Sequence, residues 1–303
     1  MKVQLLFLCL LLTVFSTPLL AQSKRVDFTI AFQGLETDLR IITSAVAPGE
    51  VLRIRTLAQA RASHGDLRRD GGHWVWHAPV EPGRYQLLFV HNEQVQTLNL
   101  FVLTPFSNGS QDELNGYRIG RYASELFRGL SSYSAPTGFI DLAHGPADLQ
   151  ISPSFTLEQF ICKQQPGHDP TYLLIRPALL IKLETLLEAA NARGWQASTF
   201  HVMSGFRTPH YNRSIGNITR TSRHLYGGAA DIWIDNDGDG DMDDLNGDGR
   251  IDRNDARALA RLAEQLARQG GRNWPSGGLG TYGSTPYHGP NVHIDARGYR
   301  ARW

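Results

Sequence analysis

The chain has 303 residues, with 30 lysines and arginines against 29 aspartates and glutamates, and 41% of its residues are hydrophobic. This balance of charge, without a basic tract, argues against a nucleic-acid-binding protein. The length is sufficient for two domains with hydrophobic cores.

Residues 1–23 predict a secretory signal peptide. Lys2 precedes an apolar run from Leu5 to Leu12, and the small-residue pattern Ala21-Gln22-Ser23 follows. The run is too short for a good membrane span, although a retained anchor is the alternative. We therefore expect export to the periplasm, the cell envelope or the extracellular space, with no membrane span after cleavage. Cys162 would then be the remaining cysteine, and its apolar neighbours predict a buried thiol without a disulfide.

Residues 24–106 predict a β-sandwich of immunoglobulin-like type. Five segments are β-branched or aromatic and are separated by turn pairs such as Pro48-Gly49. These segments are 25–32, 50–57, 73–79, 84–91 and 96–103. A spacer or docking role is expected for this domain rather than catalysis.

Residues 107–150 are expected to form a polar linker and lead-in, and residues 151–303 a second domain. Helical spacing of apolar residues predicts helices over 177–193 and 255–269. Strands are expected over 199–203, 229–234 and 291–296. Helices before short strands favour an α+β domain with a small antiparallel sheet.

Three residues of the second domain predict a zinc site. Asp231 lies on one face of the strand over 229–234, and an unpaired buried carboxylate is costly. His224 precedes it by seven residues, and His293 lies on a later strand. Two imidazoles and one carboxylate around zinc leave a fourth position for water, as in catalytic sites.

The same residues carry a family resemblance. The pattern Ser222-x-His224-x-x-Gly227-x-Ala229-x-Asp231, with the late His293, resembles the signature of zinc D-alanyl-D-alanine carboxypeptidases of the VanY and LAS type. It is most similar to the YcbK-like branch, over about 155–303. The resemblance implies a LAS-type metallopeptidase fold, zinc bound by His224, Asp231 and His293, and substrate contacts from Ser222. Arg207, in the segment SGFRTP, would bind substrate or stabilise the oxyanion.

One position departs from the family pattern. Members carry an acidic general base three residues before the last zinc histidine, where this chain has Pro290. Asp295, on the ligand face of the strand, and His288, five residues before the ligand, are the two candidates for proton transfer, with Asp295 preferred.

The aspartate-rich insertion over 235–255 predicts calcium binding in one or two loops. An EF-hand-like loop places oxygen ligands at positions 1, 3, 5, 7, 9 and 12, with glycine at position 6. The frame that begins at Asp244 resembles a dockerin loop, with ligands at Asp244, Asn246, Asp248, Arg250 through its carbonyl, Asp252 and Asp255. A weaker frame offers Asp235, Asp237, Asp239, Asp241 through its carbonyl, and Asp243.

Oxygen ligands suit calcium, whereas imidazole with carboxylate suits zinc. The sequence thus predicts an exported zinc peptidase, carboxypeptidase or endopeptidase, whose partners are the peptide stems of peptidoglycan. The alternative is a non-catalytic, metal-stabilised protein of the cell envelope that binds peptidoglycan. The missing acid at Pro290 favours this second interpretation.

Overall fold

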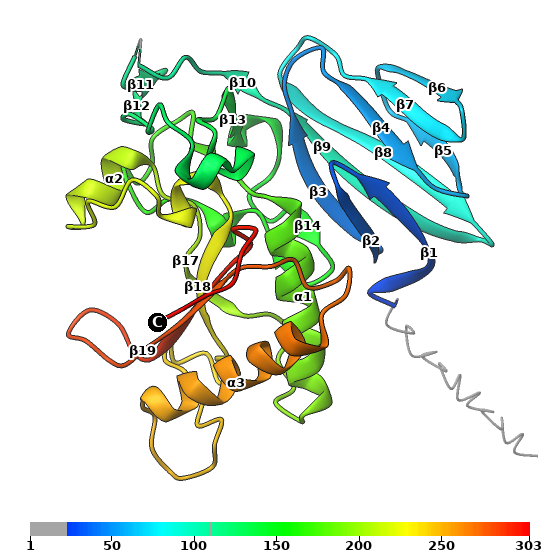
Figure 1. The fold of residues 1–303 in the computed structure, drawn as a ribbon. Helices are drawn as coiled ribbons and strands as arrows, with labels where there is room; N and C mark the ends of the chain where they lie inside the picture. The colour runs from blue at the N-terminus through cyan, green and yellow to red at the C-terminus, as the bar shows by residue number, and fades with distance from the viewer. Residues whose placement is uncertain (1–22, 110) are drawn as a thin grey trace, which may run out of the picture.

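The computed structural model describes residues 23–109 and 111–303. The predicted signal peptide therefore lies almost entirely outside the described residues. No helix in the described part of the chain is long and apolar enough to cross a membrane. The structure is a mixed α+β fold dominated by sheets (Figure 1).

The N-terminal region contains two sheets, drawn in blue to cyan in Figure 1. The first has the order β2-β1-β4-β7-β6 and consists of β1 Arg25–Phe32, β2 Leu35–Leu39, β4 Val51–Arg55, β6 Asp66–Asp70 and β7 His73–His77. The second has the order β3-β9-β8-β5 and consists of β3 Ile41–Val46, β5 Gln59–Ala62, β8 Gly83–His91 and β9 Gln94–Val102. β3 and β9 run parallel, and the other pairs are antiparallel. That these two sheets form a sandwich of immunoglobulin-like type stays a prediction.

Alternating burial explains these strands. In β4 the apolar Leu52 and Ile54 are buried, while the residues on either side of them are exposed. Trp76 of β7 is fully buried and donates a hydrogen bond from Nε1 to the carbonyl of His64 at 2.8 Å. Period-two alternation therefore turns one face of β4 toward the core.

Short elements connect the two regions. The strands among them are β10 Thr104–Pro105, β11 Glu113–Leu114, β12 Tyr117–Arg118, β13 Gly138–Asp141, β14 Gln150–Ser152, β15 Phe155–Thr156 and β16 Tyr172–Leu173. The 3-10 turns are η1 Phe127–Gly129, η2 Ser131–Tyr133, η3 Leu142–His144 and η4 Glu158–Phe160. Tyr117 and Ile119 are fully buried in the expected linker, so this segment is packed into the protein. The predicted domain limits stay a prediction.

The C-terminal region builds one sheet with helices against it. Its order is β17-β18-β20-β19-β21, with β17 His201–Ser204, β18 Ala229–Trp233, β19 Gly278–Tyr282, β20 Asn291–Asp295 and β21 Ala301–Arg302. The helices are α1 Pro177–Ala192, α2 Pro209–Ser214 and α3 Arg253–Gln269, and η5 Arg223–Tyr226 precedes β18. The two long helices and three strands lie where the sequence predicted them.

The two long helices have different beginnings. α1 begins with Pro177 in its first turn, where a missing N–H costs nothing. α3 begins with a capping box, in which the side chains of Asp252 and Asp255 each accept a hydrogen bond from the backbone N–H of the other. α3 contacts β19 and β20, so this helix covers one face of the sheet.

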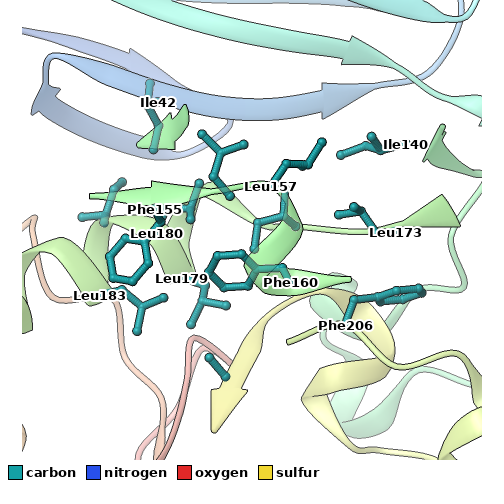
Figure 2. Packing of buried hydrophobic residues seen from close by; sticks show 14 of the residues in the cluster. Ile42, Ile140, Phe155, Leu157, Phe160, Leu173, Leu179, Leu180, Leu183 and Phe206 are labelled. Carbon is teal, nitrogen blue, oxygen red and sulfur yellow. The ribbon is translucent and has the colours of Figure 1, made fainter. Parts of the chain in front are cut away.

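One hydrophobic cluster continues across both regions. Figure 2 shows Ile42 of β3 beside the layer that holds Phe155, Leu157 and Leu180, all members of the same buried cluster. Polar contacts join the regions at the edge: Arg25 Nε lies 2.9 Å from Glu188 of α1, and Arg272 Nη2 lies 3.3 Å from Asp38. The N-terminal sheets are therefore packed against the C-terminal region.

Candidate metal centre

The register of two strands brings the central residues together. Asp231 of β18 and His293 of β20 are direct partners in the antiparallel ladder. His224 comes from η5, which ends at Gly227 with a positive φ of 64°. A Cβ at Gly227 would lie 2.5 Å from the backbone of Leu174, so both the turn and the packing require glycine there.

The three side chains converge in a buried group. His293 Nδ1 lies 2.8 Å from Asp231 Oδ1, and His224 Nε2 lies 3.3 Å from Asp231 Oδ2. His224 Nε2 and His293 Nδ1 are 3.2 Å apart. The exposed fractions of the three residues are 6% or less. The sequence predicted this group of three residues, and the structure brings them together.

Neighbouring groups fix which nitrogen of each ring faces the centre. His224 Nδ1 lies 2.7 Å from the carbonyl of Gly205, which can only accept a hydrogen bond. His293 Nε2 lies 3.1 Å from Oδ2 of Asp295. In the neutral rings, His224 Nε2 and His293 Nδ1 therefore present lone pairs toward Asp231.

This donor set fits a tetrahedral zinc ion. Ligand atoms at about 2.0–2.2 Å from zinc in a tetrahedron are separated by about 3.3–3.6 Å. The separations of 3.2 and 3.3 Å between His224 and its two partners approach that spacing, whereas His293 Nδ1 and Asp231 Oδ1, at 2.8 Å, are at hydrogen-bond distance and would move apart around the ion. The carbonyl behind one histidine and the carboxylate behind the other are the partners that metal-bound histidines usually have.

The pKa values of the three central residues are shifted because their ionisable groups are buried close together. Burial would raise the pKa of Asp231, but His224 and His293 hold it well below its usual value. Burial lowers the pKa of His224. Burial also opposes the charge on His293, yet hydrogen bonds to Asp231 and Asp295 raise its pKa to about 9. A cation at this centre is thus favoured by two carboxylates.

Asp295 lies behind His293 rather than at the centre. Its side chain is fully buried and accepts hydrogen bonds from Gly278 N at 2.8 Å and from Arg297 Nε at 2.8 Å. Arg297 Nη2 makes a further contact at 2.5 Å. Burial opposes ionisation, but His293 and Arg297 hold the pKa of Asp295 far below its usual value.

The second candidate for proton transfer, His288, is partly exposed. It precedes β20, and its Nδ1 lies 3.1 Å from Nδ2 of Asn291, which is buried and two residues before His293. No hydrogen bond joins His288 to the three central residues in the described part of the chain.

Arg207 contacts the centre directly. Its Nη2 donates to Asp231 Oδ2 at 2.6 Å, and its Nε donates to Ser204 Oγ at 2.7 Å. Ser222, by contrast, is the residue before η5, and its carbonyl accepts from Leu225 N at 3.2 Å. In this arrangement Arg207 pairs with a predicted zinc ligand, while Ser222 supports the turn that carries His224.

Several supporting residues escaped sequence reasoning. Arg297, which binds Asp295, follows it by two residues, and this close spacing of opposite charges is a signal that could have identified it. Gly278 was not predicted: a Cβ there would lie 2.3 Å from Asp295 Oδ2. Trp303, whose ring centroid lies 5.2 Å from that of His293, carries no signal in the sequence pattern.

The acidic insertion forms two successive loops without helix or strand between β18 and α3. In the first, Asp235 accepts from Gly238 N at 2.7 Å and from Gly240 N at 3.1 Å. Oxygens of Asp235, Asp237 and Asp239 approach within 4.8 Å of one another. The carboxylate of Asp241 lies so close to Gly289 that a Cβ at this glycine would clash with it. Asp243 accepts a hydrogen bond from Asn236 Nδ2 at 2.8 Å.

The second loop has the same turn but a different end. Asp244 accepts from Gly247 N and Gly249 N, both at 2.7 Å. Asp255 Oδ1 accepts from Asn246 Nδ2 at 3.0 Å, and its Oδ2 accepts from Asp252 N at 2.9 Å in the capping box. Asp248 accepts from Arg250 N at 3.0 Å. Among the described residues, a converging group of three carboxylates is found in the first loop, whereas the sequence favours the frame that begins at Asp244.

Comparison with protein families gives one match. Residues 153–246 match the family described as Peptidase M15. The matched part contains His224 and Asp231 and ends before His293. It supports the M15 zinc peptidase superfamily, to which VanY-like enzymes belong, and hence a metallopeptidase that hydrolyses peptides. No curated protein and no solved structure gives a significant match.

Proposed function

We propose that this protein is an exported zinc-dependent peptidase that cleaves the peptide stems of peptidoglycan, as a carboxypeptidase or an endopeptidase. The observation that carries the proposal is the buried group of His224, Asp231 and His293, in which Nε2 of His224 and Nδ1 of His293 face the carboxylate of Asp231. The M15 match supports the same reaction class.

His224 Nε2, His293 Nδ1 and an Asp231 oxygen would hold the zinc ion. When bound, zinc supplies a Lewis acid that polarises the scissile carbonyl. Gly205 and Asp295 keep the two rings in the orientation that this binding needs. Within this class, we propose an enzyme similar to the D-alanyl-D-alanine carboxypeptidases of the YcbK-like branch.

We assign Asp295 to positioning and not to proton transfer. Both of its oxygens accept hydrogen bonds, and Arg297 holds its negative charge. A carboxylate enclosed in this way has no access to a reacting water. His288, which is partly exposed and beside Asn291, is therefore the better of the two candidates for the proton carrier.

Arg207 would act in the proposed site by binding the zinc ligand Asp231. Its guanidinium holds one carboxylate oxygen of this ligand, so it fixes the ligand's orientation. The five donors of the guanidinium leave others for a substrate oxygen. Arg207 would therefore also contact the substrate, the role that the sequence predicts for it.

Calcium in the 235–255 insertion remains part of the proposal, with one or two ions in a structural role. Met242, which is buried, and the bond from Asp243 N to Ile234 O at 2.9 Å tie the insertion to the end of β18. An ion in either loop would stiffen the segment that directly follows the strand of Asp231.

A second function is favoured by Pro290. This buried residue stands where family members carry an acidic base, and Asp295 is enclosed behind His293. A protein that binds peptidoglycan stems through zinc, but does not cleave them, would keep the zinc ligands and lack an accessible acidic base.

The test incubates the zinc-loaded protein with purified muropeptides and follows the products by mass spectrometry. We expect shortened stem peptides with the wild type and intact stems with His224→Ala. His201→Ala is the matched control, because His201 is an exposed histidine of the same sheet whose ring stacks on Trp233 with the centroids 4.1 Å apart. Intact muropeptides with wild-type protein that holds one equivalent of zinc would favour the binding function instead.

A further inference from the structure

A cavity of about 750 Å³ lies between the N-terminal sheets and the C-terminal region. Its walls come from both: Leu35 and Ser44 belong to the N-terminal sheets, and Arg176 and Tyr226 to the C-terminal region. The segment from Ser131 to Gly138 also lines it. This cavity is built by different residues from those of the metal centre.

Two arginines lie together beside this cavity, and Arg176 is the one that lines it. Arg176 lines it and donates from Nε to the carbonyl of Tyr226 at 2.9 Å. Arg223 is 1% exposed and donates from Nη1 to the carbonyl of Ser132 at 2.7 Å. Nη2 of Arg176 donates to the same Ser132 carbonyl at 3.4 Å. The two guanidiniums therefore share one acceptor in the cavity wall.

Arg223 retains unsatisfied hydrogen-bonding capacity. Its Nε and Nη2 have no hydrogen-bond acceptor among the described residues, although both atoms are buried. Its guanidinium stacks on Tyr133, 4.3 Å from the ring centroid, and lies 5.1 Å from the ring of Tyr226. Contact with aromatic faces offsets part of the cost of burying the charge, but it satisfies neither N–H group.

No carboxylate of the described residues forms a salt bridge with Arg176 or Arg223. Asp295 acts on Arg223 electrostatically, but it is bound to Arg297. Glu50, the acidic residue of the cavity wall, accepts a hydrogen bond from Ala47 N at 2.8 Å. Burial, and then repulsion from Arg223, lower the pKa of Arg176 to about 10. Among the described residues, no ion pair with a carboxylate therefore balances the charge of Arg176.

The start of α1 adds to the positive potential. Pro177 and Ala178, the first residues of this 16-residue helix, line the same cavity. The N-terminal end of a helix carries a partial positive charge. Ser131, Ser134 and Thr137 provide hydroxyl groups in the same walls. Guanidiniums, a helix N-terminus and hydroxyls are the groups that bind carboxylate and phosphate oxygens.

We infer that this cavity is an oxyanion-binding site in which Arg176, at the N-terminus of α1 and backed by Arg223, binds a carboxylate or a tetrahedral oxyanion. It is a second ligand site, independent of the proposed peptidase activity. Because its walls come from both regions of the chain, a bound anion would also strengthen the contact between them. This gives the N-terminal sheets a role in ligand binding.

The test measures binding of sulfate and of acetate to the zinc-loaded protein by calorimetry, at constant ionic strength balanced with sodium chloride. Sulfate represents a tetrahedral oxyanion and acetate a carboxylate. We expect saturable binding of at least one of them and a matching rise in the thermal midpoint. Arg176→Gln should weaken this binding at least tenfold, and Arg53→Gln, at an exposed arginine, should leave it unchanged.

Each outcome supports or overturns the site. Binding of sulfate or acetate that is lost in Arg176→Gln supports the site and names the oxyanion geometry that it prefers. A His224→Ala arm shows whether the anion sits on zinc, because binding at the cavity persists in that variant. Absence of saturable binding by both anions, or equal binding in Arg176→Gln, overturns the inference. Titration of the wild type decides the matter by itself if a variant does not fold, because a protein that binds neither anion has no such site.

Discussion

Nε2 of His293 lies 3.1 Å from Oδ2 of Asp295, on the side of the ring opposite Asp231. The carboxylate is fully buried and is held in turn by Arg297. The chain Arg297–Asp295–His293 therefore fixes both the rotation of the imidazole and the nitrogen that faces the metal centre.

Asp295→Asn should weaken zinc binding while leaving all three proposed ligands in place. Loss of a carboxylate behind a metal-bound histidine typically reduces metal affinity about 10–100-fold. Competition with a chromogenic chelator measures this affinity. Asp112→Asn, at an exposed ion pair with Arg121, is the control. Unchanged zinc affinity with lost peptide cleavage would instead return Asp295 to the role of proton carrier.

Gly278→Ala should destabilise the protein by disturbing Asp295. The added Cβ would lie 2.3 Å from Asp295 Oδ2 and 2.9 Å from Arg297 Nη2, so the ion pair must move. Overpacking in a tight interior costs about 1–3 kcal/mol. Urea unfolding measures this cost. In Gly283→Ala the nearest atom is Arg253 Cβ at 3.6 Å, an ordinary contact, and similar losses in both variants would contradict the explanation.

Arg207→Gln should lower zinc affinity as well as activity. Its Nη2 holds Asp231 Oδ2 at 2.6 Å, so removing the guanidinium frees the ligand carboxylate to rotate. We expect a loss in zinc affinity of about tenfold, in the range for groups that orient metal ligands. Arg121→Gln serves as the comparison. Full zinc affinity with a raised KM would show that Arg207 acts on substrate alone.

The sequence predicted the residues of the candidate metal centre because each of them lies in a pattern that is local in the chain. The period of two along β18 and β20 placed Asp231 and His293 on strand faces, and the register then made them neighbours. The surroundings of Asp295 depend on contacts between distant segments, such as Gly278 N and Lys182 Nζ. Such contacts follow from tertiary packing and leave no periodic pattern, so Asp295 could not be distinguished in advance from a proton carrier.

The acidic insertion was predictable only in its turns. The spacing of its aspartates and glycines is sufficient to predict them, and Asp235 and Asp244 each accept hydrogen bonds from later glycine N–H groups. The frame that begins at Asp244 was preferred because all of its ligand positions are filled, with Asp255 at position 12. The residue type of Asp255 fitted a ligand position, but it also fitted the capping box of α3, which the structure shows.

Calcium should raise the thermal midpoint of the protein at millimolar concentration. Asp235→Asn and Asp244→Asn each remove the first carboxylate of one loop, and each should remove one equivalent of calcium if both loops bind. Calorimetry gives the number of sites, and magnesium is the control because it disfavours flexible oxygen cages. A midpoint that does not respond to calcium would leave the aspartates as a hydrogen-bonded acidic loop.

Lys182 should make stability depend on pH. It is 1% exposed, donates to the carbonyl of Asp295 at 2.7 Å, and lies over Trp274. Burial lowers its pKa to about 7 from an ordinary value of 10.5. Below pH 7 the Lys182 amine is protonated in both the folded and the unfolded state. The full cost of burying its charge then lowers the stability of the folded state.

Between pH 7 and about 10.5, the unfolded state holds this proton and the folded state has lost it. Stability should therefore rise with pH in this range, by at most about 1.4 kcal/mol per pH unit from this one group. Urea unfolding of the wild type and of Lys182→Met is measured at several pH values. The difference between the two curves gives the contribution of Lys182 to the pH dependence of stability, because the other groups titrate in both proteins. Lys163→Met, at an exposed lysine, should follow the wild type. Parallel curves for wild type and Lys182→Met would show that the amine stays charged in the folded protein, stabilised by the Asp295 carbonyl.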